Sequence, residues 1–263
     1  MTAPPSRSDV SSLTPPLRPL RLGLAVVWAA LLFGGFLLGN TEVSDAYRMP
    51  LWTRLGSSAV LVLAAQWAYV TVSGTRAAAY ALLIAVGMAL GFLGDLSNAG
   101  LLPLGEPVMG AIAAFGLGHV AYIAACITIV LRGRLNDRRV FIASLAAWEL
   151  VGVVGWAAVV ASAGDLAAVH WAALPYTLLL AGTAGVTSAL ALQDRRLALL
   201  GVGGALFLIS DLVLAYRLFH DEFYLGGDVV WLLYGPAQMF IVYSVGSAVH
   251  VLVRPPAVAT REA

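Results

Sequence analysis

The chain has 263 residues, of which 60% are hydrophobic and 11% charged, whereas an ordinary soluble domain is about a quarter charged. This composition excludes an ordinary soluble domain and indicates a polytopic membrane protein, and the net charge of +1 provides no basic field for a nucleic-acid partner. All fifteen basic residues are arginines, which excludes chemistry on a lysine amine, and the single cysteine, Cys126, excludes an intrachain disulfide.

Eight stretches reach the roughly 20 mainly apolar residues that a bilayer-spanning helix needs. No alternating pattern typical of a membrane β-barrel is present, so the predicted fold is all-α, a bundle of eight transmembrane helices within residues 20–253. Residues 1–19, rich in Pro and Ser, are expected to form a disordered cytoplasmic tail, and 254–263 a second cytoplasmic tail. The predicted spans are 22–39, 55–73, 77–95, 108–131, 140–162, 171–192, 197–217 and 229–252.

The arginines distinguish the two ends of these spans. An even number of spans places both termini on one side, and twelve of the fifteen arginines fall there, whereas only Arg48, Arg54 and Arg217 fall on the other. Basic residues are enriched in cytoplasmic loops. We therefore expect a multi-pass protein of the cell membrane with both termini in the cytoplasm.

Two aspartates interrupt the apolar runs. Asp95 ends the third span in GFLGDLSNAG, and Asp211 lies inside the seventh in ALFLISDLVLAY. A charged side chain at the centre of the bilayer costs about 2.5–3.5 kcal/mol even on lenient scales and is a functional-site hypothesis by default. Asp211 is expected about 20 Å along its helix, too deep for its short side chain to reach water. The structural alternatives are solvation of Asp95 at the interface and an interhelical hydrogen bond for Asp211.

Other polar side chains at similar depth share helix faces. Phe115, His119 and Tyr122 follow i, i+4, i+7 spacing in the fourth span, and Tyr234 and Gln238 are i, i+4 in the eighth. Together with the two aspartates, these side chains are predicted to line one cavity in the outer half of the bilayer. A satisfied core histidine and simple interhelical hydrogen bonds are the structural alternatives.

The remaining polar residues limit the kinds of reaction that the predicted site could catalyse. Glu149, midway along the fifth span, is interpreted as a third buried acid, either in a structural pair or in the site. The four histidines do not converge, which argues against a three-histidine zinc hydrolase, and no metal site is predicted. No G-x-S-x-G, Walker or H-E-x-x-H motif is present. Two carboxyl groups with a histidine, a tyrosine and an amide indicate acid–base chemistry.

A faint internal repeat links the two halves of the chain. FLGDL in the third span is similar to LISDL in the seventh, and AFGLGH (114–119) in the fourth is similar to LYGPAQ (233–238) in the eighth. Two parallel four-helix repeats around a common axis would account for both similarities. Chance similarity between apolar helices is the alternative.

Four short motifs follow one another along the chain. They are GD at Gly94 and Asp95; F-x-x-x-H-x-x-Y at Phe115, His119 and Tyr122; S-D-x-x-L-A-x-x-x-F from Ser210 and Asp211 to Phe219; and Y-x-x-A-Q at Tyr234, Ala237 and Gln238. In this order, and with eight spans from residue 22 onwards, they resemble the YhhN-like family of integral-membrane lysoplasmalogenases. Ser97, Asn98 and the RGRLNDRR loop depart from the family pattern, and these departures concern substrate detail.

The resemblance implies hydrolysis of the vinyl ether bond of lysoplasmalogens to a fatty aldehyde and glycerophospho-ethanolamine or -choline. The partner would be a lysophospholipid within the bilayer, and no cofactor is implied. Protonation of the β-carbon yields an oxocarbenium ion that water attacks, and two carboxyl groups divide this work as in glycosidases. We expect Asp95 and Asp211 to form the pair, with His119 as a third catalytic residue. Either aspartate could be the acid, and the greater depth of Asp211 favours that residue.

Five further residues are expected to bind substrate or position water: Tyr122, Ser210, Arg217, Tyr234 and Gln238. Arg217 would either meet the lipid phosphate or anchor its helix at the interface. Ser97 and Asn98 are candidates for contact with the head group.

Two other classes of function are compatible with the same residues. A proton-coupled transporter of small solutes or lipids would also use buried acids and parallel repeats, although Pro236 has no counterpart at position 117. A non-enzymatic lipid-binding or scaffold protein would tolerate neutralisation of both aspartates. Uptake into proteoliposomes, measured beside aldehyde release, separates a transporter from a hydrolase.

Overall fold

The computed structural model describes residues 17–40, 45–102, 106–133, 135–164 and 167–253, and this part of the chain contains helices but no strand. The predicted tails at 1–16 and 254–263 lie outside the described residues. Within these ranges eight helical segments are long and apolar enough to cross a membrane, which confirms the all-α fold with eight spans. They are α2–η1–α3 (Leu17–Ala29, Ala30–Gly34, Gly35–Leu38), α4 (Leu51–Val72), α5 (Ala78–Asn98), α6 (Pro107–Gly133), α7 (Arg138–Val159), α8 (Ala168–Gln193), α9 (Ala198–Phe219) and α10 (Gly226–Val253).

Several helices extend beyond the predicted spans, because an apolar run marks only the part of a helix that lies within the hydrocarbon. Helix α2 begins at Leu17, so the last residues of the predicted tail are helical. Helix α5 continues to Asn98 and ends before Gly100, whose φ of 69° leaves the helical region. Asp95 therefore lies within the last turn of α5 and not at its end.

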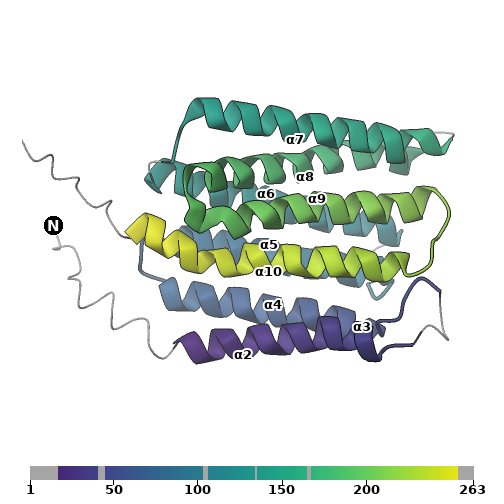
Figure 1. The fold of residues 1–263 in the computed structure, drawn as a ribbon, viewed down its shortest axis with the longest axis horizontal. Coiled ribbons are helices and arrows are strands. Elements are labelled where there is room, and N and C mark those ends of the chain that lie inside the picture. The colour runs from purple at the N-terminus through teal and green to yellow at the C-terminus, as the bar shows by residue number, and fades with distance from the viewer. Residues whose placement is uncertain (1–16, 41–44, 103–105, 134, 165–166, 254–263) are drawn as a thin grey trace, which may run out of the picture.

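The helices lie side by side in one bundle, with α2 and α7 at opposite edges (Figure 1). Between them α4, α5, α6, α8, α9 and α10 pack against one another. We call the end of the bundle that holds Leu17 and Val253 the proximal end. The distal end is the opposite one, where α3, α5, α7 and α9 finish and α4, α6, α8 and α10 begin.

The packing of the first four spans is repeated by the last four. Helix α5 packs on α6 as α9 packs on α10, and α4 packs on α5 as α8 packs on α9. The two halves also join in an equivalent way, because α4 contacts α10 and α8 contacts α6. Each half keeps its first span outside, α2 against α4 and α7 against α8. This arrangement is the one that two parallel four-helix repeats require.

Close approach of α9 and α10 depends on Gly203. A methyl group at this position would lie 3.0 Å from the carbonyl oxygen of Ala237 and 3.1 Å from Cβ of Phe240. Gly203→Ala is therefore expected to destabilise the protein by about 1–3 kcal/mol through overpacking. Thermal unfolding in detergent checks this, and Gly23→Ala is the control because a methyl group there meets nothing within 4 Å. Equal midpoints for the two variants would contradict the prediction.

Candidate active site

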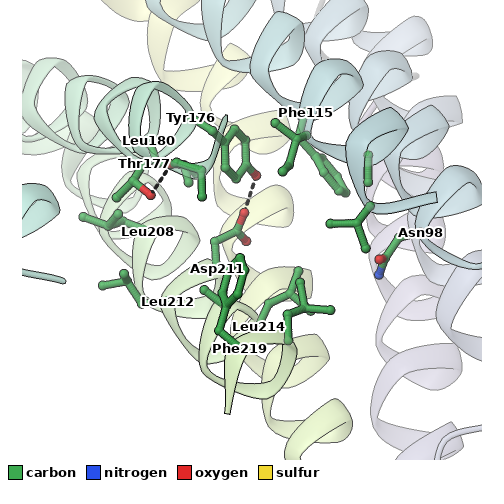
Figure 2. A pocket seen from close by; sticks show the side chains of 16 residues that line it. Asn98, Phe115, Tyr176, Thr177, Leu180, Leu208, Asp211, Leu212, Leu214 and Phe219 are labelled. Atoms are coloured by element: carbon green, nitrogen blue, oxygen red, sulfur yellow. Dashed lines mark hydrogen bonds between the residues drawn. The ribbon is translucent and has the colours of Figure 1, made fainter. Parts of the chain in front are cut away.

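Asp211 is the polar centre of a cavity near the distal end. It lies on α9, about 12 Å from the end of that helix at 1.5 Å per residue. The hydroxyl of Tyr176 on α8 donates a hydrogen bond to its Oδ2. Its Oδ1 lies 3.0 Å from the Ser210 hydroxyl oxygen, whose proton is shared with the carbonyl oxygen of Phe207 at 2.8 Å. Figure 2 shows the Tyr176 hydroxyl pointing at the carboxylate. Asp211 is only half-buried, because one side of it faces the cavity.

The cavity has a volume of about 50 Å³ and is formed by α5, α6, α8 and α9. Asp211, Tyr176, Thr177 and Asn98 are the polar residues among its walls, and the others are apolar. Figure 2 shows Leu208, Leu212, Leu214 and Phe219 gathered around the carboxylate, with Phe115 across from them. Such a lining fits a hydrocarbon group that ends beside a carboxyl group.

Of the side chains predicted to line one cavity, Asp211 and Phe115 line this one, whereas Asp95 lies on α5 outside its walls. Its side chain is buried, with 5% of its surface exposed, and the hydroxyls of Ser58 on α4 and Tyr234 on α10 interact with its carboxyl group. Asp211 is near enough to interact with it electrostatically. Its Oδ2 is buried and has no hydrogen-bond partner among the described residues. The structure thus brings the two predicted carboxyl groups together and leaves one oxygen of Asp95 available to a substrate or water.

His119 lies deeper, on α6. Its Nδ1 is 2.9 Å from the Thr183 hydroxyl on α8, a hydrogen bond that fixes the ring. The edge of the ring packs on Phe207 at 4.4 Å between centroids and lies 6.4 Å from the Tyr176 ring. Its Nε2 is a second buried polar atom without a partner in the described part of the chain. Buried polar groups are nearly always satisfied, so both unsatisfied atoms are consistent with a site that receives water or a ligand.

Tyr234 and Gln238 close the site from α10. The Gln238 amide nitrogen donates to the Tyr234 hydroxyl, while its Oε1 accepts from Ser58 at 3.2 Å. Both side chains reach α5 because it carries Gly91, where a methyl group would lie 3.3 Å from the Gln238 nitrogen and 3.7 Å from the Tyr234 oxygen. A hydroxyl–amide–hydroxyl chain therefore runs along Asp95.

The other predicted residues lie around this centre or away from it. Tyr122 is buried below His119, with ring centroids 5.8 Å apart, and its hydroxyl contacts the Met88 sulfur at 4.0 Å. Arg217 lies at the distal end, where it pairs with Glu222. The interpretation of Glu149 as a third buried acid is wrong, because α7 is an edge helix and leaves Glu149 half-exposed in an apolar groove beside Gly182.

Ser58, Tyr176 and Thr183 are components of the site that the sequence analysis missed. They lie in spans two and six, in which no acid or histidine drew attention. The sequence did contain a signal for two of them. The number of residues between Ser58 and Tyr176 is nearly the same as that between Asp95 and Asp211. In the structure Tyr176 donates to Asp211, and Ser58 interacts with Asp95 while its hydroxyl donates to Gln238. The repeat therefore extends to the neighbours of the acids.

Taken together, the residues combine two nearby carboxyl groups, several hydroxyls and an apolar cavity. That combination suits proton transfer to and from an amphiphile. No curated protein and no solved structure shows significant similarity to the chain. The family model of the YhhN family matches residues 51–245, which include Asp95, His119, Asp211 and Gln238. The chain belongs to the YhhN family.

Proposed function

We propose that the protein is a lysoplasmalogenase, a membrane hydrolase that cleaves the vinyl ether bond of a lysophospholipid into a fatty aldehyde and a glycerophospho-alcohol. One observation carries the proposal: an apolar cavity ends at Asp211, and a second carboxyl group, Asp95, lies within electrostatic reach of it. Membership of the YhhN family is consistent with this activity.

The shape of the site suggests how the substrate is oriented. The part of the alkenyl chain next to the ether bond would occupy the cavity beside Leu208, Leu212 and Phe219, with the rest of the chain in the bilayer. The β-carbon of the vinyl ether lies on the chain side of the ether oxygen. It would therefore approach Asp211, while the ether oxygen and glycerol would extend towards Asp95.

The reaction then needs one acid and one carboxylate. Asp211 transfers its proton to the β-carbon, whose π electrons form the new C–H bond, and the adjacent carbon becomes an oxocarbenium ion. The Asp95 carboxylate stabilises that cation through its unpaired Oδ2 and accepts a proton from the attacking water. The hemiacetal collapses to the aldehyde as Asp95 gives its proton to the ether oxygen, which leaves as the glycerol hydroxyl, and Asp211 takes the proton of the hemiacetal hydroxyl, so both groups return to their starting states. One water is consumed and nothing is oxidised or reduced.

Isotope labelling tests the proposal directly. Purified protein in detergent is incubated in D₂O with a 1-alkenyl lysophosphoethanolamine, and the aldehyde is trapped and analysed by mass spectrometry. We expect aldehyde with one deuterium on the carbon next to the carbonyl, and no product from the saturated 1-alkyl ether. The proposal is wrong if the protein releases no aldehyde, or cleaves the saturated ether equally well.

Tyr176 is expected to act through Asp211. Tyr176→Phe removes the hydroxyl that donates to Oδ2 and should lower kcat roughly tenfold, the effect of one hydrogen bond to a charged or reacting group. KM should change little, because the ring that lines the cavity is kept. Steady-state kinetics check this, and a change confined to KM would show that Tyr176 serves only to shape the cavity.

The proposal also includes which end of the protein faces the cytoplasm. The arginine distribution favours a cytoplasmic proximal end, and on that basis the distal end, with the cavity and Asp95, faces the opposite leaflet of the cell membrane. Labelling of single cysteines placed at the two ends with a membrane-impermeant thiol reagent, in a Cys126→Ser background, measures this directly.

A further inference from the structure

Three side chains form a cationic cluster at the distal end, beside the site but not part of the proposed chemistry. We call Arg54, Tyr47 and Arg217 the rim cluster. The Arg54 guanidinium lies over the Tyr47 ring, 3.7 Å from its centroid, and that of Arg217 lies 5.0 Å from the same centroid. Arg217 also donates to the Tyr47 hydroxyl at 3.1 Å. Trp231 borders the cluster, with its ring 6.0 Å from Arg54.

Two of the nearby acids, Glu222 and Asp228, and the other rim arginine have partners of their own. Glu222 forms an ion pair with Arg217 at 2.5 Å. Asp228 interacts with Arg54 electrostatically, but its carboxylate accepts the backbone amides of Arg48 and Met49 at 2.6 and 3.1 Å. The Arg48 guanidinium donates to the carbonyls of Leu37 and Gly39 at 3.5 and 3.4 Å.

Arg54 differs from these neighbours. In the described ranges of the chain no carboxylate forms an ion pair with it, and its Nε is buried without a hydrogen-bond partner. Burying part of a guanidinium costs free energy when no carboxylate contacts it. A bound anion would offset that cost through charge-assisted hydrogen bonds. Arg54 is half-buried, so part of its side chain remains exposed.

Arg54 also lies near the catalytic centre. It precedes Ser58 by one turn of α4, so both lie on one helix face. Ser58 faces Asp95, and Arg54 itself interacts electrostatically with that carboxyl group. A ligand held by Arg54 would therefore lie on the Asp95 side of the site, at the end of the substrate opposite to the alkenyl chain.

The internal repeat explains why the two sides of the site differ. The halves join through two equivalent contacts, that of α4 with α10 and that of α8 with α6. The α8–α6 side holds the apolar cavity. The α4–α10 side holds Arg54 from α4 and Trp231 from α10, with the Tyr47 ring close to two guanidinium groups. One side thus suits hydrocarbon and the other an anion.

We infer that Arg54, supported by Tyr47 and Arg217, binds the phosphodiester anion of the lysophospholipid head group. This inference rests on the proposed function, because the vinyl ether and the phosphate of such a substrate are only a few bonds apart. Arg54 has the main role here and Arg217 a supporting one, because the charge of Arg217 is already paired with Glu222.

Binding of lipids that cannot be hydrolysed tests the site without turnover. The affinities of a saturated 1-alkyl lysophosphoethanolamine and of the matching 1-alkylglycerol, which lacks the phosphate, are measured for purified wild-type protein and for Arg54→Gln. We expect Arg54→Gln to weaken binding of the phospholipid roughly 10- to 100-fold, the effect of a charge-assisted hydrogen bond, and to leave the alkylglycerol unchanged. Arg48→Gln removes a charge from the same rim and should leave both affinities near those of the wild type.

Each other outcome is decisive. If Arg54→Gln behaves like Arg48→Gln, or weakens both lipids equally, the inference is wrong. If Arg54→Gln cannot be purified, Arg54→Lys carries the test with a smaller expected loss, about threefold to tenfold, because lysine keeps the charge but not the planar fork. If inorganic phosphate binds through Arg54 as tightly as the phospholipid does, the ligand is a free anion and the lipid assignment fails. Arg54-dependent binding in a protein that releases no aldehyde would overturn the hydrolase and leave the anion site standing.

Discussion

Asp211→Asn is expected to lower kcat for aldehyde release by about 1,000-fold, within the range that loss of a general acid produces. Asparagine keeps the size of the side chain and can still hydrogen-bond to Tyr176 and Ser210, but it has no proton to give to the β-carbon. Because the apolar walls are unchanged, binding of the saturated 1-alkyl lysophospholipid should stay within about threefold of the wild type. The measurements are single-turnover aldehyde release and equilibrium binding.

Glu149→Gln is the matched control for this variant. It also neutralises a carboxyl group in the middle of a span, but Glu149 lies in the groove formed with α6 and α8, apart from the cavity that contains Asp211. Its rate should therefore equal that of the wild type. Near wild-type aldehyde release by a folded Asp211→Asn protein would remove Asp211 from the reaction.

Asp95→Asn is expected to lower kcat by about 100- to 1,000-fold, because the oxocarbenium ion loses the negative charge beside it. The amide can replace the contacts with Ser58 and Tyr234, so the folded protein should be retained. The distinguishing measurement is the pH profile of kcat for the wild type and both variants. A reaction that needs one protonated acid and one ionised carboxylate gives a bell-shaped profile.

The two limbs of the profile identify the roles. The acid works only while protonated, so its titration makes the rate fall as pH rises, and the residual activity of Asp211→Asn should lack this alkaline limb. The carboxylate works only while ionised, so its titration makes the rate fall as pH decreases, and Asp95→Asn should lack the acidic limb. The opposite assignment of limbs would exchange the roles of the two aspartates, and unchanged limbs in both variants would refute the pair.

The sequence determined the class of the protein and the identity of its unusual residues. Eight apolar runs in a chain with few charges leave only helices as a way to satisfy the backbone in lipid, so composition alone predicts the number and approximate bounds of the spans. The high cost of an acid in hydrocarbon made Asp95 and Asp211 conspicuous. Ordered motifs around them were enough to suggest the family that the family model then matched.

Which helices meet, and which side chains they bring together, was decided by the tertiary structure. Glu149 shows this most clearly, since an acid midway along an apolar span is buried or lipid-facing according to the position of its helix in the bundle, and α7 lies at the edge. Ser58, Tyr176 and Thr183 became recognisable only through contacts with residues far away in the chain. In the sequence Arg54 contributes only to the arginine distribution that predicts orientation. The structure adds that Glu222 and Asp228 near it are bound to other groups. The pattern of a single helix gives the face of a side chain, but its partners depend on packing between helices, which apolar surfaces in lipid specify through small residues and shape rather than through hydrophobicity.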